Sequence, residues 1–153
     1  MLTAIPRHWF SWDFALTDGE KPLADIDISW WRENGELTIS NVPYRVHREA
    51  PVMGAFILES SGAVIARAEK PNAFSRRMVI EYADVRYELK PSFVFSRRFH
   101  LISGTTIVGT LSPSGLLSRQ MNIDLSDDLP LPVGVFIVWL TLILWKRDWD
   151  AAG

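Results

Sequence analysis

The sequence predicts a mainly β fold, a closed antiparallel barrel of about 11–12 strands around a hydrophobic C-terminal helix. Three observations lead to this prediction. Short segments with alternating apolar residues recur along the chain with Pro and Gly between them, a motif repeats in the middle third, and residues 133–145 are almost wholly apolar. So many strands need a sandwich or a closed barrel to remove their free edges, and an all-apolar helix needs a container.

The bulk composition is that of one folded domain. The chain has 153 residues, of which 48% are hydrophobic and 22% charged, so we treat residues 1–153 as a single domain. There is no Cys, which excludes disulfides, thiolate metal sites and cysteine nucleophiles. The N-terminal residues lack a basic stretch followed by an apolar one, so no signal peptide is expected. We therefore expect a cytoplasmic protein, with a peripheral position at the inner membrane face as a further expectation.

The first half of the chain shows strand-like alternation. Residues 1–23 are expected to form an N-terminal segment with one strand, and residues 24–125 a meander of hairpins. The alternating apolar positions are Phe10, Trp12, Phe14 and Leu16, then Ile26, Ile28 and Trp30. Asn34-Gly35 is the dipeptide typical of a two-residue hairpin turn, and it precedes Leu37 and Ile39.

The middle of the chain contains a threefold repeat. The segments PNAFSRRMVI, PSFVFSRRFHL and PSGLLSRQMNI begin at Pro71, Pro91 and Pro113. Such self-similarity indicates one supersecondary unit used repeatedly. The units are expected to contain hairpins, which are residues 55–59 with 64–69, 76–82 with 85–90, and 97–102 with 107–111.

Strand parity places the first arginine of each repeat on the apolar face. Arg76, Arg97 and Arg119 are each in phase with the inward positions of the strand that follows, whereas Arg77 and Arg98 are out of phase. Two interpretations stay open for the three inward arginines. They bind backbone carbonyls at one rim of the barrel, in reach of the end of the helix, or they form a ring for a phosphate or carboxylate.

The C-terminal apolar run is expected to be a buried helix within residues 130–148. The segment is apolar all the way round, so it must lie in protein or in lipid. Thirteen to fifteen residues give a helix of about 20–22 Å, short of the ~30 Å hydrocarbon core of a bilayer. We therefore favour the barrel interior, and a C-terminal membrane anchor is the alternative.

Charge is unevenly distributed along the chain. Residues 66–120 carry nine basic and four acidic side chains, whereas the segments before and after them are net acidic. This middle third is the candidate anion-binding or lipid-binding surface. The candidate residues are Lys70, Arg76, Arg77, Lys90, Arg97, Arg98 and Arg119. Two aromatic residues beside them, Phe95 and Phe99, are expected in the core.

Part of the chain resembles the tubby C-terminal-like superfamily, which includes the LURP-one-related proteins and the phospholipid scramblases. The resemblance covers about residues 24–147. It rests on the barrel-and-helix architecture, on the segments FILESSGAVIARAEK (56–70) and YELKP (87–91), and on the repeated Ser-Arg-Arg. It implies binding of phosphoinositides or other membrane lipids through basic residues on the barrel surface. Scramblases imply calcium-linked lipid movement, but no acidic loop of EF-hand spacing is present, so no calcium site is carried over.

No pattern for catalysis stands out. The three histidines, His8, His47 and His100, are far apart, and there is neither a Gly-x-Ser-x-Gly elbow nor a phosphate-binding Gly loop. We therefore expect no enzyme, no metal, no cofactor and no nucleic-acid partner. The expected function is a non-enzymatic module that binds an anionic membrane lipid through the middle third. The alternative is a structural or accessory subunit of a protein complex, in one version anchored in a membrane by its C-terminal helix. The sequence leaves the oligomeric state open.

Overall fold

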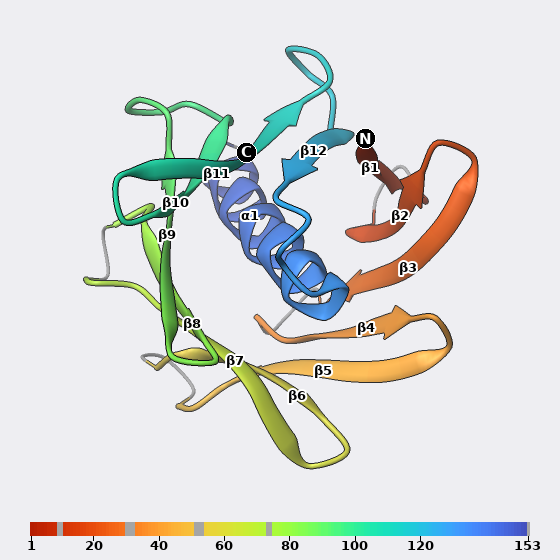
Figure 1. Ribbon diagram of the computed structural model, residues 1–153. Helices are drawn as coiled ribbons and strands as arrows, with labels where there is room; N and C mark the ends of the chain where they lie inside the picture. The colour runs from red at the N-terminus through yellow and green to blue at the C-terminus, as the bar shows by residue number, and fades with distance from the viewer. Residues whose placement is uncertain (9–10, 30–32, 51–53, 73–74, 153) are drawn as a thin grey trace.

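The fold is a closed antiparallel barrel with one helix along its interior. The computed structural model describes residues 1–8, 11–29, 33–50, 54–72 and 75–152. Each strand pairs with its neighbours in sequence, and β1 closes the sheet by pairing with β12, with Leu2 opposite Ile123. Twelve strands and one helix are described: β1 (Leu2–Pro6), β2 (Asp13–Asp18), β3 (Lys21–Ile28), β4 (Gly35–Ile39), β5 (Val42–Arg48), β6 (Phe56–Ser60), β7 (Ala63–Glu69), β8 (Met78–Tyr82), β9 (Val85–Pro91), β10 (Phe99–Ser103), β11 (Thr106–Pro113), β12 (Met121–Leu125) and α1 (Leu131–Ala152). The predicted fold class is confirmed, and Figure 1 shows α1 surrounded by the strands.

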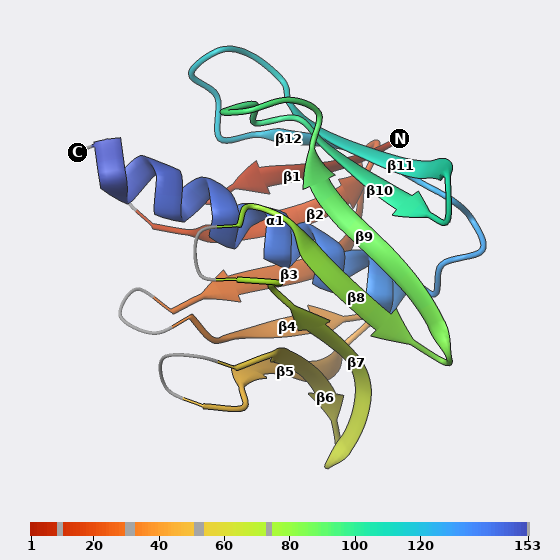
Figure 2. The ribbon, with the colours of Figure 1, turned by 90° about the vertical axis from the view of Figure 1, so that its left-hand side faces the viewer.

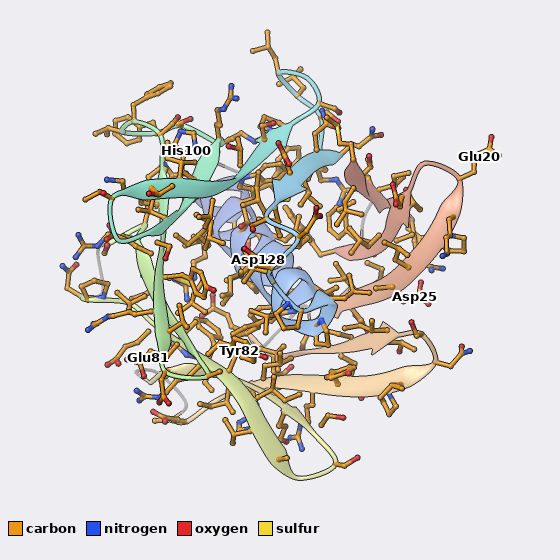
Figure 3. All side chains as sticks on the ribbon, in the orientation of Figure 1. Glu20, Asp25, Glu81, Tyr82, His100 and Asp128 are labelled. Atoms are coloured by element: carbon orange, nitrogen blue, oxygen red, sulfur yellow. The ribbon has the colours of Figure 1, made fainter. Side chains whose placement is uncertain are left out.

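The strands form because their apolar residues alternate. In β10, Phe99 and Leu101 are fully buried, while His100 between them lies on the outer face. Met78 and Ile80 of β8 follow the same pattern. Figure 3 shows side chains filling the space between the strands and α1, whereas Glu20 projects away from the tip of the β2–β3 hairpin. Because the sheet is closed, all twelve strands contribute to one core.

Helix α1 is the centre of that core. All residues from 133 to 145 are buried, as predicted. The helix is longer than expected and ends at Ala152, four residues after the predicted limit of 148. The ion pair between Lys146 and Asp150, 2.7 Å apart and one turn along the helix, stabilises this extra length. In the described part of the chain, no helix is long and apolar enough to cross a bilayer.

The two ends of the barrel are built differently. At one end, which we call the turn end, tight turns such as Ser40-Asn41 and Ala83-Asp84 join the strands, and all four of these residues have positive φ. At the other, which we call the loop end, longer loops join the strands, and four of them close with the same kind of backbone hydrogen bond, between residues six apart. These bonds run from Arg7 N to Asp13 O, Glu49 N to Ala55 O, Ser92 N to Arg98 O and Ser114 N to Gln120 O. Figure 2 shows that the C-terminal end of α1 emerges at the loop end.

Two sequence predictions in the first half of the chain are wrong. Asn34-Gly35 is not a two-residue turn, because Gly35 lies in the sheet and pairs with both Ile28 and Val46. A Cβ there would lie 2.1 Å from the carbonyl oxygen of Asp27 and 2.6 Å from Nε1 of Trp139, so only glycine fits. The N-terminal segment forms two strands, β1 and β2, rather than one. The alternation that we expected at Trp12, Phe14, Leu16, Ile26 and Ile28 is confirmed by their burial, whereas Phe10 and Trp30 lie outside the described residues.

Candidate functional site

The repeated Ser-Arg motif forms the same turn three times at the loop end. Each serine, at 75, 96 and 118, donates its N–H to the carbonyl oxygen three residues earlier, at 3.0–3.3 Å. Its Oγ accepts the N–H of the residue two positions later, at 3.0 Å in every copy. The motif is therefore a turn rather than the start of a strand. β8 and β10 begin two residues later than predicted, at Met78 and Phe99, and β12 likewise begins two residues after Arg119, at Met121.

The first arginine of each motif points inward, as strand parity predicts, and links its own loop to the next one. Arg76 donates to Ser96 O at 2.8 Å, and Arg97 donates to Ser118 O and to Leu116 O, the latter at 3.1 Å. Arg119 continues the series across the barrel closure, with 2.6 Å to Ser11 O and 2.8 Å to His8 O. The interpretation in which these arginines bind backbone carbonyls therefore accounts for Arg97 and Arg119, although the carbonyls belong to loops and not to α1. Arg76 divides its contacts between a loop carbonyl and the carboxylate of Asp148 on α1, at 2.7 Å.

The same three guanidinium groups cover aromatic rings of the core. Their central carbon lies 5.4 Å from the ring centre of Phe99 for Arg76, 4.4 Å from Trp145 for Arg97, and 5.4 Å from Trp12 for Arg119. Burial lowers the pKa of the Arg97 and Arg119 side chains, yet arginine keeps its charge at any physiological pH. The motif thus closes the core at the loop end and ties neighbouring loops together.

A second group of charges at the loop end was missed by the sequence analysis. Glu33 accepts hydrogen bonds from Arg48, at 2.9 Å, and from both Nε and Nη2 of Arg147 on α1. Burial raises the pKa of Glu33, but the Arg147 hydrogen bond and the positive neighbours more than offset this, so its pKa lies below the usual value. Burial and the positive charges of Arg147 and Arg48 lower the pKa of Lys70 to about 8. Lys70 therefore belongs to this partly buried network rather than to an exposed surface.

The remaining basic candidates lie on the outer face of the barrel. Arg77, Lys90 and Arg98 are exposed, and all three lie at or next to the loop-end termini of β8, β9 and β10. Arg77 forms an ion pair with Glu88, at 3.5 Å. Among the described residues, neither Lys90 nor Arg98 takes part in an ion pair. The structure therefore divides the seven candidates into four partly buried side chains and three outward ones.

Two neighbouring loops next to these outward cations have apolar tips. Phe93, Val94 and Phe95 of loop 92–98 are 70%, 74% and 87% exposed, and Leu116 and Leu117 of loop 114–120 are 95% and 90% exposed. The Arg97 hydrogen bonds to Leu116 O and Ser118 O hold the loops side by side. The prediction that Phe95 lies in the core is therefore wrong, whereas Phe99 is fully buried as expected. Phe95 also has a φ of 66°, an unusual conformation for a large side chain.

Residues 89–123 carry positive charge and no acidic side chain, although Asp148 of α1 lies close enough to interact with Arg97. The chain contains no Asp or Glu between residues 89 and 123, which span β10, β11 and both loops, while Lys90, Arg97, Arg98 and Arg119 lie within it. We call the outer face of this segment at the loop end, with its two apolar tips, the basic-apolar face. It joins the exposed cations and the exposed apolar groups in one place.

An acidic pair lies on another part of the outer surface. Asp13 of β2 and Asp27 of β3 are directly opposite each other. Burial, a hydrogen bond to Asp13 and the charge of Asp13 raise the pKa of Asp27 from 3.8 to about 6. Among the described residues, no group of three His, Cys, Asp or Glu side chains is arranged to hold a metal ion.

We expect Asp27→Asn to stabilise the protein at neutral pH and to have little effect near pH 4. A raised pKa means that the folded state binds its proton more tightly, so stability falls as the pH rises from about 4 to about 6. Asp27 is exposed, so the gain is below about 1 kcal/mol after solvent screening. Thermal unfolding of both proteins at about pH 4 and about pH 7.5 measures it. Asp124→Asn, at an exposed position of β12, is the control, and an equal effect of Asp27→Asn at both pH values would contradict the account.

No protein-family model, no curated protein and no solved structure matches this chain.

Proposed function

We propose that the protein is a non-enzymatic module that binds the surface of anionic membranes through its basic-apolar face. The observation that carries the proposal is the acid-free segment 89–123, whose outward cations lie beside exposed apolar loop tips. Anionic lipid surfaces attract basic side chains by about 1 kcal/mol for each Lys or Arg near the surface. The closed barrel around an apolar helix also supports the proposal. The sequence resembles the tubby C-terminal-like superfamily, and that resemblance implies lipid binding through basic residues on the barrel surface.

The arrangement of the inward arginines also bears on the ligand. Arg97 and Arg119 each give two donors to backbone carbonyls, so they are poorly placed to recognise a lipid headgroup. The outward residues Lys90 and Arg98 have no ion-pair partner among the described residues, so contact with an anionic surface would not first require a pair to break. Headgroup attraction is therefore assigned to these outward cations, with Arg77 a secondary contributor because it already pairs with Glu88.

The proposal predicts binding to anionic vesicles that depends on charge and on salt. The full chain should pellet with vesicles of phosphatidylcholine and phosphatidylserine, and much less with phosphatidylcholine alone. Reversing both outward charges, Lys90→Glu with Arg98→Glu, should weaken binding about tenfold or more. Added salt should weaken the binding of the unmodified protein, because it screens exposed charges.

A matched control separates this face from general charge effects. Arg86 is also an exposed cation of the middle third, but it lies near the turn end, beside the Ala83-Asp84 turn. Arg86→Glu should leave vesicle binding nearly unchanged. If the unmodified protein does not pellet with anionic vesicles, or if Arg86→Glu is as harmful as the double reversal, the proposed function is wrong.

A further inference from the structure

The two exposed apolar loop tips are unlike the other exposed apolar residues of the barrel. At the turn end, Val64, Val85 and Ile107 are exposed, one on each of three strands that leave a turn. One exposed apolar side chain on a strand is normal on soluble proteins. At the loop end, three consecutive apolar residues and two more from the neighbouring loop are exposed, at 70–95%. Exposed apolar residues concentrated in this way are typical of interaction sites.

These loops are held in shape without packing their apolar side chains. In loop 92–98 the hydroxyls of Ser92 and Ser96 are 3.0 Å apart, and in loop 114–120 those of Ser114 and Ser118 are also 3.0 Å apart. Arg97 ties the second loop to the first. The positive φ of Phe95 is an unfavourable conformation for an aromatic residue. The loops are therefore ordered by polar contacts, and the apolar groups at their tips are left facing solvent.

We propose that the tips 93–95 and 116–117 insert into the interfacial layer of an anionic bilayer, so that the protein docks with its loop end on the membrane. This inference rests on the proposed function. The tips are projecting loops, a shape that enters a soft lipid layer. The cations Lys90 and Arg98 lie just behind the tips, where they would meet headgroups while the apolar groups pass beyond them. A second copy of the chain would bring the same cations face to face, which charge repulsion opposes.

Because the chain has no cysteine, a single cysteine introduced at a loop tip can be labelled with a dye at that position alone. Single replacements Phe95→Cys and Leu117→Cys, labelled with an environment-sensitive nitrobenzoxadiazole dye, should give brighter, blue-shifted emission when anionic vesicles are added to the full chain. Val64→Cys at the turn end is the matched control, since Val64 is also an exposed apolar side chain, and its emission should not change. Nitroxide-labelled lipids should quench the dye at positions 95 and 117 and not at 64.

The outcomes distinguish this inference from the proposed function. If the labelled proteins pellet with anionic vesicles while the dyes at 95 and 117 stay in water, the inference is wrong and the proposed function stands. If the proteins do not pellet, the proposed function fails. If the emission changes with protein concentration alone, without vesicles, a second copy covers the tips and the inference is overturned.

A second variant shows that the effect does not come from misfolding. Phe95→Gly removes an exposed ring at a position whose positive φ suits glycine, so its Tm should equal or exceed that of the unmodified protein. Its affinity for anionic vesicles should nevertheless fall by about tenfold. Val64→Ser is the control and should bind normally. Unchanged binding of Phe95→Gly would overturn the proposed insertion.

Discussion

Trp139→Ala is expected to lower the free energy of unfolding by about 3–5 kcal/mol. Trp139 lies in the middle of α1 and is fully buried. Its ring packs edge to face against the ring of Phe56, with 5.4 Å between the ring centres. The substitution leaves a large cavity at the centre of a closed barrel, whose walls are joined all round by hydrogen bonds and cannot collapse onto it. Denaturant unfolding followed by circular dichroism measures the change.

Trp149→Ala is the matched control on the same helix. Trp149 is 56% exposed beyond the barrel, so its loss should change stability by less than about 0.5 kcal/mol. Trp139→Phe should cost much less than Trp139→Ala, because it keeps most of the ring and removes a buried indole N–H that has no partner among the described residues. A cost below about 1 kcal/mol for Trp139→Ala would mean that α1 does not fill the barrel.

Arg97→Met is expected to destabilise the protein by about 2–4 kcal/mol, whereas Arg98→Met is expected to be nearly neutral. Arg97 donates to Leu116 O and Ser118 O and covers the ring of Trp145, whose own N–H donates to Arg97 O at 2.9 Å. The neighbouring Arg98 is exposed. Methionine keeps much of the apolar stem in both variants, so the difference between them measures the guanidinium contacts.

The same pair of variants separates a structural arginine from a binding one. Arg97→Met should also increase hydrogen exchange in loop 114–120, since it removes the link to the neighbouring loop. Arg98→Met should weaken binding to anionic vesicles without changing the unfolding midpoint. If Arg97→Met were as stable as Arg98→Met and lost vesicle binding instead, the inward arginines would be ligands for the anion and the structural account would be wrong.

The barrel was predictable because the patterns that indicate it lie within short, continuous segments of the sequence. Alternation in segments such as β10 sets which residues face inward, and the all-apolar run 133–145 requires a closed container. Strand parity was enough to place Arg76, Arg97 and Arg119 inside the rim. It placed the strand starts two residues too early, because a serine hydroxyl that accepts a backbone N–H turns the chain where the pattern of side chains still reads as extended.

The surface was less predictable because it depends on contacts that are distant in sequence. Glu33 and Arg147 are 114 residues apart, and nothing in either neighbourhood indicates their pairing. The exposure of the loop tips was not predicted, for a different reason. Phe95 is an aromatic residue close to a strand, which is usually a core position, whereas the structure places it in loop 92–98 with a positive φ and 87% exposed. The acid-free segment 89–123 can be read from the sequence, but only the structure shows that loops 92–98 and 114–120 are neighbours.

Hydrogen exchange of the full chain, with and without anionic vesicles, tests most directly the claim that the basic-apolar face is the membrane-binding surface. Exchange in loops 92–98 and 114–120 is expected to slow when vesicles are present. The Ser61-Gly62 and Ala83-Asp84 turns, which lie at the opposite end, should show no change, and residues 133–145 should exchange slowly under both conditions. Protection of the turn end, with the two loops unchanged, would contradict the claim.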